Sequence, residues 1–350
     1  MKYLLWVFLF FSIVGFSQDA ILNDADHPEA ELHAAINPLD TNNIVVVVQY
    51  GFGSQDAFYT HIYYSKNYGL TWNLSDYHGT ADNSQCGDAV LSFDDAGNLY
   101  LVDLMIDQTN DTVYTILSKS ADGGANWEYL KKVVHNDSDK PWLAIDTFAN
   151  SSHSGNIYIP VVEEIPMLYT LNNNFQTIDS LPIPDGDHLP SVVVRRDGTV
   201  FTSTVALTDS INTVYVQEYS NGGATIYHST PIVSFPDYTF NAPDISMRFQ
   251  PTAYLAVDNS GGKYDGRLYL SYTASEEYSP DYFNVFITYS DDGGQYWSTP
   301  HIVHNDAQYN IQQFYSSIYV NDAGTVIMDW YDRRNYADST KMTDFYMGIS

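Results

Sequence analysis

The chain has 350 residues, of which 44% are hydrophobic and 15% aromatic, including 30 tyrosines and 17 phenylalanines. Its formal net charge is −29, which excludes nucleic acid and anionic lipid as natural partners because their phosphates would be repelled. Aromatic and β-branched side chains pack well on pleated surfaces, so this composition favours an all-β protein with a sizeable core.

The first 17 residues predict a signal peptide. Lys2 supplies the positive start, an apolar run follows over residues 3–14, and Gly15 and Ser17 provide small residues for cleavage. The run is too short for a membrane span, and no other segment is long and apolar enough. We therefore expect a secreted, periplasmic or cell-surface protein. Its single cysteine, Cys86, allows no intramolecular disulfide bond.

Three similar stretches follow apolar, aromatic runs: SKNYGLTW at 65–72, SADGGANW at 120–127 and SDDGGQYW at 290–297. In each, Asn or Asp stands two residues after Ser, Gly four after it and Trp seven after it. An Asn or Asp side chain caps such a turn by accepting backbone N–H groups, and glycine adopts the positive φ that the turn needs. Each stretch therefore predicts a hairpin turn with a buried tryptophan anchor. Weaker copies stand at 171–174 and 220–223.

A second motif opens each unit, in which a short strand passes through an acidic or glycine turn into another strand. Its copies lie at 34–47, 89–101, 142–159, 191–201, 253–270 and 317–327. With the turns, it gives six units of about four strands, repeated roughly every 57 residues, as in β-propellers. We expect one six-bladed β-propeller domain over residues 18–350. Its last blade is expected to be incomplete, with the protein truncated at its C-terminus, because Ser350 stands where the sixth turn would begin.

The turn motif resembles the Asp-box, or BNR, repeat of sialidases and their relatives, and the resemblance covers nearly all of residues 18–350. DKPW at 139–142, with GNIY at 155–158, and WYDRR at 330–334 are similar to secreted sialidase-like repeat proteins of Bacteroidetes. This resemblance implies a glycan or glycoconjugate ligand. The histidines form no metal-binding pattern and no glycine pair precedes a helix, so we expect neither a metal nor a cofactor.

In a propeller, the loops between second and third strands and those between blades share one face around the central channel. Arg248, Arg333 and Arg334 belong to such loops. Sialidases hold the sialic acid carboxylate with three arginines, because the guanidinium fork matches a carboxylate. The resemblance therefore implies that these arginines, with Trp142, bind substrate. The alternative is that they pair with acids such as Asp332.

Glycoside hydrolysis needs two carboxylates or, in sialidases, a tyrosine nucleophile with an acidic partner. The catalytic candidates on the predicted channel face are Asp139, Glu163, Tyr331 and Asp332. Other acidic residues expected on that face are Asp88, Glu164, Asp187, Glu276 and Glu277.

Two functions follow from these features. One is an exo-glycosidase of sialidase-like fold that acts on acidic glycans. The other is a non-catalytic module of a longer exported protein, which binds glycans or a protein partner through the channel face. The Arg-Ile-Pro motif that opens true sialidases is absent, and HAAINP stands at 33–38 in its place. The sequence leaves open whether the protein is an enzyme.

Overall fold

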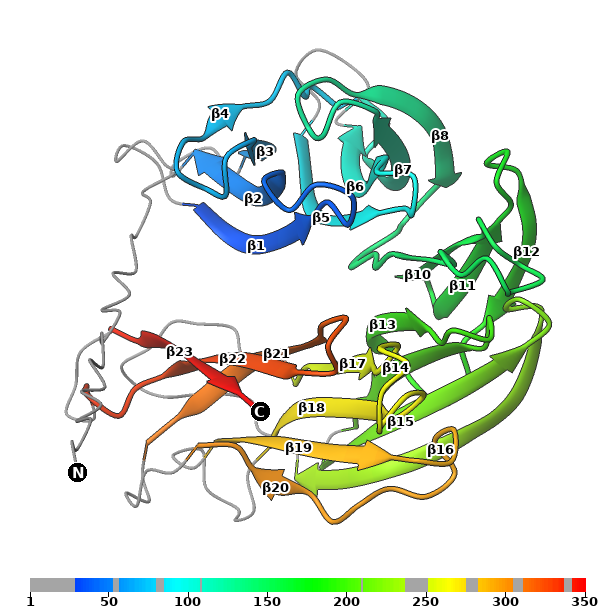
Figure 1. Cartoon of the computed structure of the whole chain (residues 1–350), viewed down its shortest axis with the longest axis vertical. Coiled ribbons are helices and arrows are strands. Elements are labelled where there is room, and N and C mark those ends of the chain that lie inside the picture. Colours follow the sequence, from blue (N-terminus) through cyan, green and yellow to red (C-terminus); the bar gives the residue numbers. More distant parts are fainter. Residues whose placement is uncertain are drawn as a thin grey trace, which may run out of the picture.

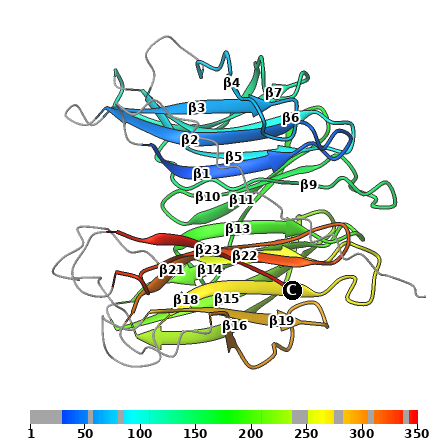
Figure 2. The same cartoon turned by 60° about the vertical axis from the view of Figure 1, so that its left-hand side comes forward.

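The structure is a computed structural model that describes residues 29–52, 57–79, 85–107, 109–208, 210–236, 251–274, 283–304, 311–336 and 342–350. Every named element in these ranges is a β-strand, and the strands form six antiparallel sheets. Figure 1 shows the sheets as blades arranged in a ring, and Figure 2 shows the same ring turned by 60°. The predicted all-β, six-bladed propeller is therefore confirmed. Within the described ranges, no helix is long and apolar enough to span a membrane.

The blades follow one another in sequence order. The first three consist of β1 (Glu29–Ile36), β2 (Ile44–Phe52), β3 (Ala57–Ser65) and β4 (Asn73–Leu74); β5 (Gln85–Phe93), β6 (Leu99–Asp107), β7 (Thr112–Ser120) and β8 (Glu128–Val134); and β9 (Ala144–Ile145), β10 (Ile157–Val162), β11 (Pro166–Leu171) and β12 (Thr177–Pro182). The last three consist of β13 (His188–Val194), β14 (Val200–Ala206), β15 (Ile211–Ser220) and β16 (Thr225–Pro236); β17 (Ala253–Val257), β18 (Leu268–Ala274), β19 (Asn284–Ser290) and β20 (His301–Ile302); and β21 (Gln313–Val320), β22 (Val326–Asp332) and β23 (Asp344–Ile349). The first strand of each blade lies innermost in the ring (Figure 1).

Burial on both faces explains the sequences of the second strands. In β18 (LYLSYTA) every side chain is buried, and in β6 (LYLVDLMID) all but the last two are. A blade packs against its neighbours through both faces, so these strands are nearly continuous apolar runs instead of alternating apolar and polar residues.

Hydrophobic clusters join each blade to the next. Val45 and Ile62 of blade 1 meet Leu101 of blade 2, and corresponding clusters lie between blades 2 and 3, 3 and 4, 4 and 5, and 5 and 6. Burial of this apolar surface is the main stabilising contribution to the ring. Among the described residues, no such cluster joins blade 6 to blade 1.

The turn motif has the same hydrogen bonds in its three full copies. Ser120 Oγ accepts the backbone N–H of Gly124 (2.9 Å), and Asp122 Oδ1 accepts that of Asn126 (3.0 Å). Gly124 has a φ of +95°, and a Cβ there would lie 2.9 Å from Val45 of the preceding blade, so glycine is required on both counts. The turn of blade 2 therefore packs closely against β2 of the preceding blade.

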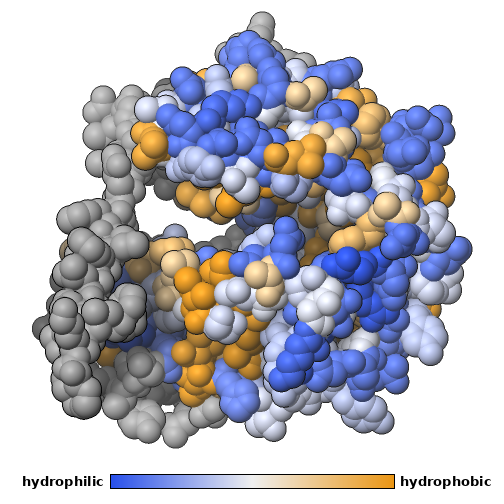
Figure 3. Space-filling model, in the orientation of Figure 1, coloured by the Kyte–Doolittle hydropathy of each residue, from blue (hydrophilic) through white to orange (hydrophobic). Residues whose placement is uncertain are grey.

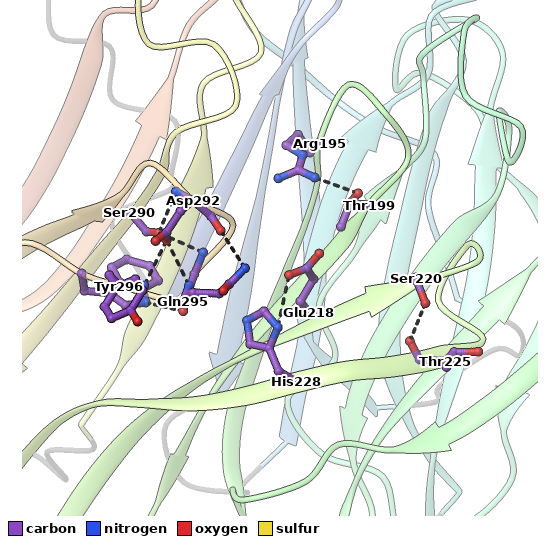
Figure 4. A network of polar contacts seen from close by, with 12 residues as sticks. Arg195, Thr199, Glu218, Ser220, Thr225, His228, Ser290, Asp292, Gln295 and Tyr296 are labelled. Carbon is purple, nitrogen blue, oxygen red and sulfur yellow. Dashed lines mark hydrogen bonds and ion pairs between the residues drawn. The ribbon is translucent and has the colours of Figure 1, made fainter.

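Figure 4 shows the third turn, at 290–297, beside the outer strands of blade 4. Ser290 Oγ accepts the backbone N–H of Gly294 (2.8 Å), and Asp292 Oδ1 accepts that of Tyr296 (3.0 Å). His228 and Glu218, whose side chains are 3.3 Å apart, lie on β16 and β15 next to this turn.

The tryptophans of the three turns are half-buried, where buried anchors were expected. Trp127 packs at the edge of the cluster between blades 1 and 2 and donates its indole N–H to Ser75 Oγ (2.9 Å). Trp297 has the corresponding place between blades 4 and 5. Because the turns lie at the rim of the blades, each indole keeps one edge in solvent.

Candidate active site

The innermost strands share an irregularity at one place. Five residues before the last residue of the innermost strand, φ is positive in five blades, namely at Glu31 (52°), Asp88 (54°), Lys140 (46°), Leu189 (46°) and Tyr315 (50°), of which Lys140 precedes its strand β9. In β1, β5, β13 and β21 the pairing register also shifts there, which identifies a β-bulge. A bulge re-aims a side chain. Because the blades repeat around the channel, these five residues form a ring at one mouth of it.

The charged members of this ring come from the first three blades and contact one another. Lys140 Nζ lies 2.8 Å from Asp88 Oδ1 and 3.4 Å from Glu31 Oε2. Asp139, which precedes Lys140, accepts the Lys140 backbone N–H (3.0 Å) and pairs with Val162 in an isolated bridge. Two carboxylates thus contact the ammonium group, and a third, that of Asp139, is close enough to act on it through its charge. The side chains of Glu31, Lys140 and Asp88 are 46%, 31% and 13% exposed, so the cluster opens to solvent on the Glu31 side.

Proximity of the carboxyl groups separates their proton affinities. The hydrogen bond with Asp88 is the largest cause that raises the pKa of Glu31, to about 7, followed by burial and the charge of Asp88. Burial opposes ionisation of Asp88, but the hydrogen bond with Glu31 and the charge of Lys140 outweigh it and lower the pKa of Asp88. Burial and then the charge of Asp88 raise the pKa of Asp139. Near neutral pH the cluster therefore holds an ionised Asp88 beside a Glu31 that readily carries a proton.

Aromatic side chains meet across the channel next to the cluster. The Trp142 ring lies 5.4 Å from His33 and 5.0 Å from Tyr254, and these residues come from blades 3, 1 and 5. His33 Nδ1 accepts the backbone N–H of Leu91 (3.3 Å), and desolvation lowers the pKa of His33 to about 4, so the imidazole is neutral. Burial raises the pKa of Tyr254 to about 12. The mouth therefore combines ionisable groups with an uncharged aromatic floor.

A buried hydrogen-bond network contacts the bulge at Gly87 and Asp88. Asp103 on β6 is fully buried and accepts hydrogen bonds from Thr60 Oγ1 (3.0 Å) and Tyr77 Oη (2.8 Å), as well as from the backbone N–H of Gly87. Burial raises the pKa of Asp103 well above its usual range. Blade 1 also contacts the bulge through Gln49, whose Oε1 accepts the Asp88 backbone N–H at 3.4 Å.

Two of the predicted site residues belong to this mouth. Asp139 is part of the carboxylate cluster, and Trp142 is the centre of the aromatic floor. Glu163 lies in the β10–β11 hairpin instead, where it accepts a hydrogen bond from Tyr169 Oη (2.6 Å).

The remaining predicted residues lie in blade 6. Asp332 is fully buried and accepts hydrogen bonds from the Arg334 guanidinium (2.9 Å from Nε) and the Trp330 indole (3.0 Å). Arg333 is buried and donates to Gln312 Oε1 (2.8 Å). Tyr331 is 42% exposed and stacks on Phe314. Arg248 lies outside the described residues.

Glu31 and Lys140 were not among the residues that the sequence singled out. Asp88, by contrast, was expected on the channel face. The signal that could have found all three is their shared position in the repeat, five residues before the end of each innermost strand (Ile36, Phe93 and Ile145).

Comparison with known proteins places the fold and goes no further. No family model matches the chain, and no curated protein matches it. Among solved structures, an α-L-arabinanase of Penicillium chrysogenum complexed with arabinobiose is 13% identical, with a TM-score of 0.58 over 93% of this protein and 95% of that one. An α-L-arabinofuranosidase of Fusarium graminearum in complex with arabinobiose is 10% identical, with a TM-score of 0.60 over 93% and 95%.

The NanB sialidase of Streptococcus pneumoniae is also similar. It is 11% identical, with a TM-score of 0.56 over 91% of this protein and 68% of that one. At such identities, the likeness establishes a propeller fold of the kind that glycosidases and sialidases have, whereas the chemistry has to be argued from the site.

Proposed function

We propose that this protein is a glycoside hydrolase whose active site is the carboxylate cluster at the channel mouth. The observation that carries the proposal is the meeting of Glu31, Asp88 and Asp139 around Lys140, with proton affinities that differ between neighbouring carboxyl groups. Cleavage of a glycosidic bond needs one carboxyl group that donates a proton and another that is ionised. The similar folds of an arabinanase and a sialidase support the same reaction class.

In this proposal Glu31 is the general acid, because its pKa of about 7 keeps it protonated at mildly acidic pH. It protonates the departing glycosidic oxygen. Asp88, held ionised by Lys140, stabilises the positive charge that develops on the sugar ring. Water then forms a bond to the sugar carbon that the oxygen has left and gives one proton back to Glu31. Asp139 completes the cluster. Trp142, on the aromatic floor, offers an apolar face to the sugar.

The charges at the mouth favour a neutral glycan over an acidic one. Lys140 is already paired with Asp88 and Glu31, so the cluster offers an anionic sugar carboxyl groups and a cation that is already neutralised. Arg334 is already bound to Asp332, and Arg333 is buried against Gln312. We also infer that the repeated turns are Asp boxes and that the predicted signal peptide directs the enzyme to glycans outside the cytoplasm.

Hydrolysis of a panel of aryl glycosides and neutral oligosaccharides, arabinobiose included, tests the proposal. We expect Glu31→Gln and Asp88→Asn each to lower kcat by about 100-fold or more, because each removes a group that acts in the transition state. Glu128→Gln, an exposed acidic residue on β8, is the matched control and should leave the rate unchanged. Binding of the panel without hydrolysis would support the non-catalytic alternative.

A further inference from the structure

A row of aromatic rings leads from the channel mouth along blade 6. It starts at Tyr315 of the ring of bulges, whose side chain lies 5.5 Å from Phe314. Phe314 stacks on Tyr331 at 5.8 Å, and Tyr331 meets Phe345 edge-on at 6.0 Å, all measured between ring centroids. Phe314, Tyr331 and Phe345 are cross-strand partners on β21, β22 and β23. We call Tyr315, Phe314, Tyr331 and Phe345 the aromatic track.

The outer part of the track is exposed, and its inner part is anchored. Phe314 is buried, whereas Tyr331 is 42% and Phe345 61% exposed. Figure 3 shows apolar surface over β22 and β23, beside an opening between blades 1 and 6. Rings held by a buried neighbour lose little conformational freedom when a ligand packs on them, and this makes them efficient contacts.

The charged residues next to the track in sequence point away from it, whereas Asp329, two residues before Tyr331, shares its face and accepts a hydrogen bond from Ser317 Oγ (2.8 Å). Successive side chains of a strand face opposite sides of its sheet, so Asp332 and Asp344, which flank the track residues in sequence, lie on the other side. There Arg334 bonds Asp332 and lies over the Tyr346 ring at 4.3 Å. The exposed part of the track, Tyr331 and Phe345, thus offers two aromatic rings set edge to face, and the Tyr331 phenol group is the polar group that these two rings carry.

Such a surface suits an uncharged sugar chain, whose C–H faces pack on aromatic rings while its hydroxyl groups stay in water. The 5.5–6.0 Å between successive centroids is close to the length of one sugar residue. The track starts at Tyr315, which has in blade 6 the repeat position that Glu31 and Asp88 have in blades 1 and 2. One oligosaccharide could therefore contact both the track and the cluster.

We propose that Tyr331 and Phe345 form outer binding subsites for a neutral oligosaccharide whose reacting end lies at the Glu31–Asp88 cluster. The reacting end rests on the proposed function, whereas the subsites themselves do not. The enzyme should therefore discriminate by substrate length, because only a substrate of several sugar residues reaches from the cluster to Phe345.

Binding can be measured apart from catalysis by titrating the full-length Glu31→Gln variant with arabinobiose and arabinohexaose, and with neutral glucose and xylose oligomers of the same lengths. In at least one series, we expect the hexasaccharide to bind about 10-fold or more tightly than the disaccharide. Tyr331→Ala and Phe345→Ala should each remove most of that gain, and Tyr331→Phe should retain it. Tyr319→Ala is the matched control, since Tyr319 is 61% exposed at the other end of β21.

The outcomes separate the two proposals. Length-dependent binding lost with Tyr331→Ala, in a wild-type protein that hydrolyses nothing, supports the subsites and overturns the hydrolase. Hydrolysis whose preference for long substrates does not change with Tyr331→Ala or Phe345→Ala overturns the subsites alone. Tighter binding of acidic than neutral oligosaccharides also overturns them. So does a change in sedimentation on Phe345→Ala, because it would show that this face is covered by a second copy of the protein.

Discussion

Lys140 Nζ lies 2.8 Å from Asp88 Oδ1, and this ion pair joins blade 3 to blade 2 between residues 52 positions apart in the sequence. The same ammonium reaches Glu31 of blade 1 at 3.4 Å. Neutralisation by Lys140 is what allows three carboxyl groups to lie together at the channel mouth, because like charges at such distances would otherwise prevent ionisation. The pair is therefore central to the proposed chemistry.

Replacing Lys140 with Met should shift the pH dependence of kcat/KM. The Lys140 charge lowers the pKa of both Asp88 and Glu31, so its loss raises both. Both limbs of the profile should move to higher pH by about one unit, and the maximum rate should fall. Lys140→Arg keeps the charge and should keep the limbs in place. An unchanged profile in Lys140→Met would exclude Asp88 and Glu31 as the titrating groups.

Glu31→Gln should change how stability depends on pH. The pKa of Glu31 is raised from 4.5 to about 7 in the folded protein, so between these values the folded state binds more protons than the unfolded state. Stability of the wild type is therefore lost as pH rises from about 4.5 to 7. The variant lacks this loss, and its melting temperature relative to wild type should rise across that window. Thermal melts at closely spaced pH values measure the difference, and a constant difference would contradict it.

His33→Phe should have the opposite dependence. The pKa of His33 is lowered from 6.5 to about 4, so between these values the unfolded state binds more protons than the folded protein. The wild type therefore loses stability as pH falls from about 6.5 to 4, and His33→Phe should be spared that loss. In the same thermal melts, the melting temperature of the variant minus that of the wild type should increase as the pH is lowered. His78, an exposed histidine beside Asp76, provides the control.

Asp103 should tolerate an amide but not an apolar side chain. Asp103→Leu leaves the buried hydroxyl groups of Thr60 and Tyr77 without their acceptor, and this should cost about 2–4 kcal/mol of unfolding free energy. Asp103→Asn keeps a hydrogen-bonding group and should cost much less. The raised pKa of Asp103 means that wild-type stability falls as pH rises above about 4, the ordinary value for aspartate in an unfolded protein. Asp103→Asn should lack that fall, and chemical denaturation at pH 5 and pH 8 measures both effects.

The sequence by itself determined the fold, because a propeller blade is a local unit that recurs with a fixed period. Ser120, Asp122 and Gly124 make their turn within five residues, and the same spacing at 65–72 and 290–297 reports the same turn. Runs such as LYLVDLMID indicated strands buried on both faces. The period of these signals was then enough to give six blades. The sequence also predicted that Asp88 and Asp139 lie on the channel face, because loop position follows from strand order.

The tertiary structure alone decided which charged side chains meet. Glu31, Asp88 and Lys140 come from three blades, and a positive φ at the same position of each blade brings their side chains together. Such an irregularity has no strong sequence signature, since Glu, Asp, Lys, Leu and Tyr all occupy it here. The sequence left open whether Arg333 and Arg334 bind a ligand or pair with acids such as Asp332, and in the structure Arg334 bonds Asp332 and Arg333 is buried. The order of charged residues in a loop does not show whether their side chains face each other or the solvent, because side-chain direction is fixed only when neighbouring strands pack.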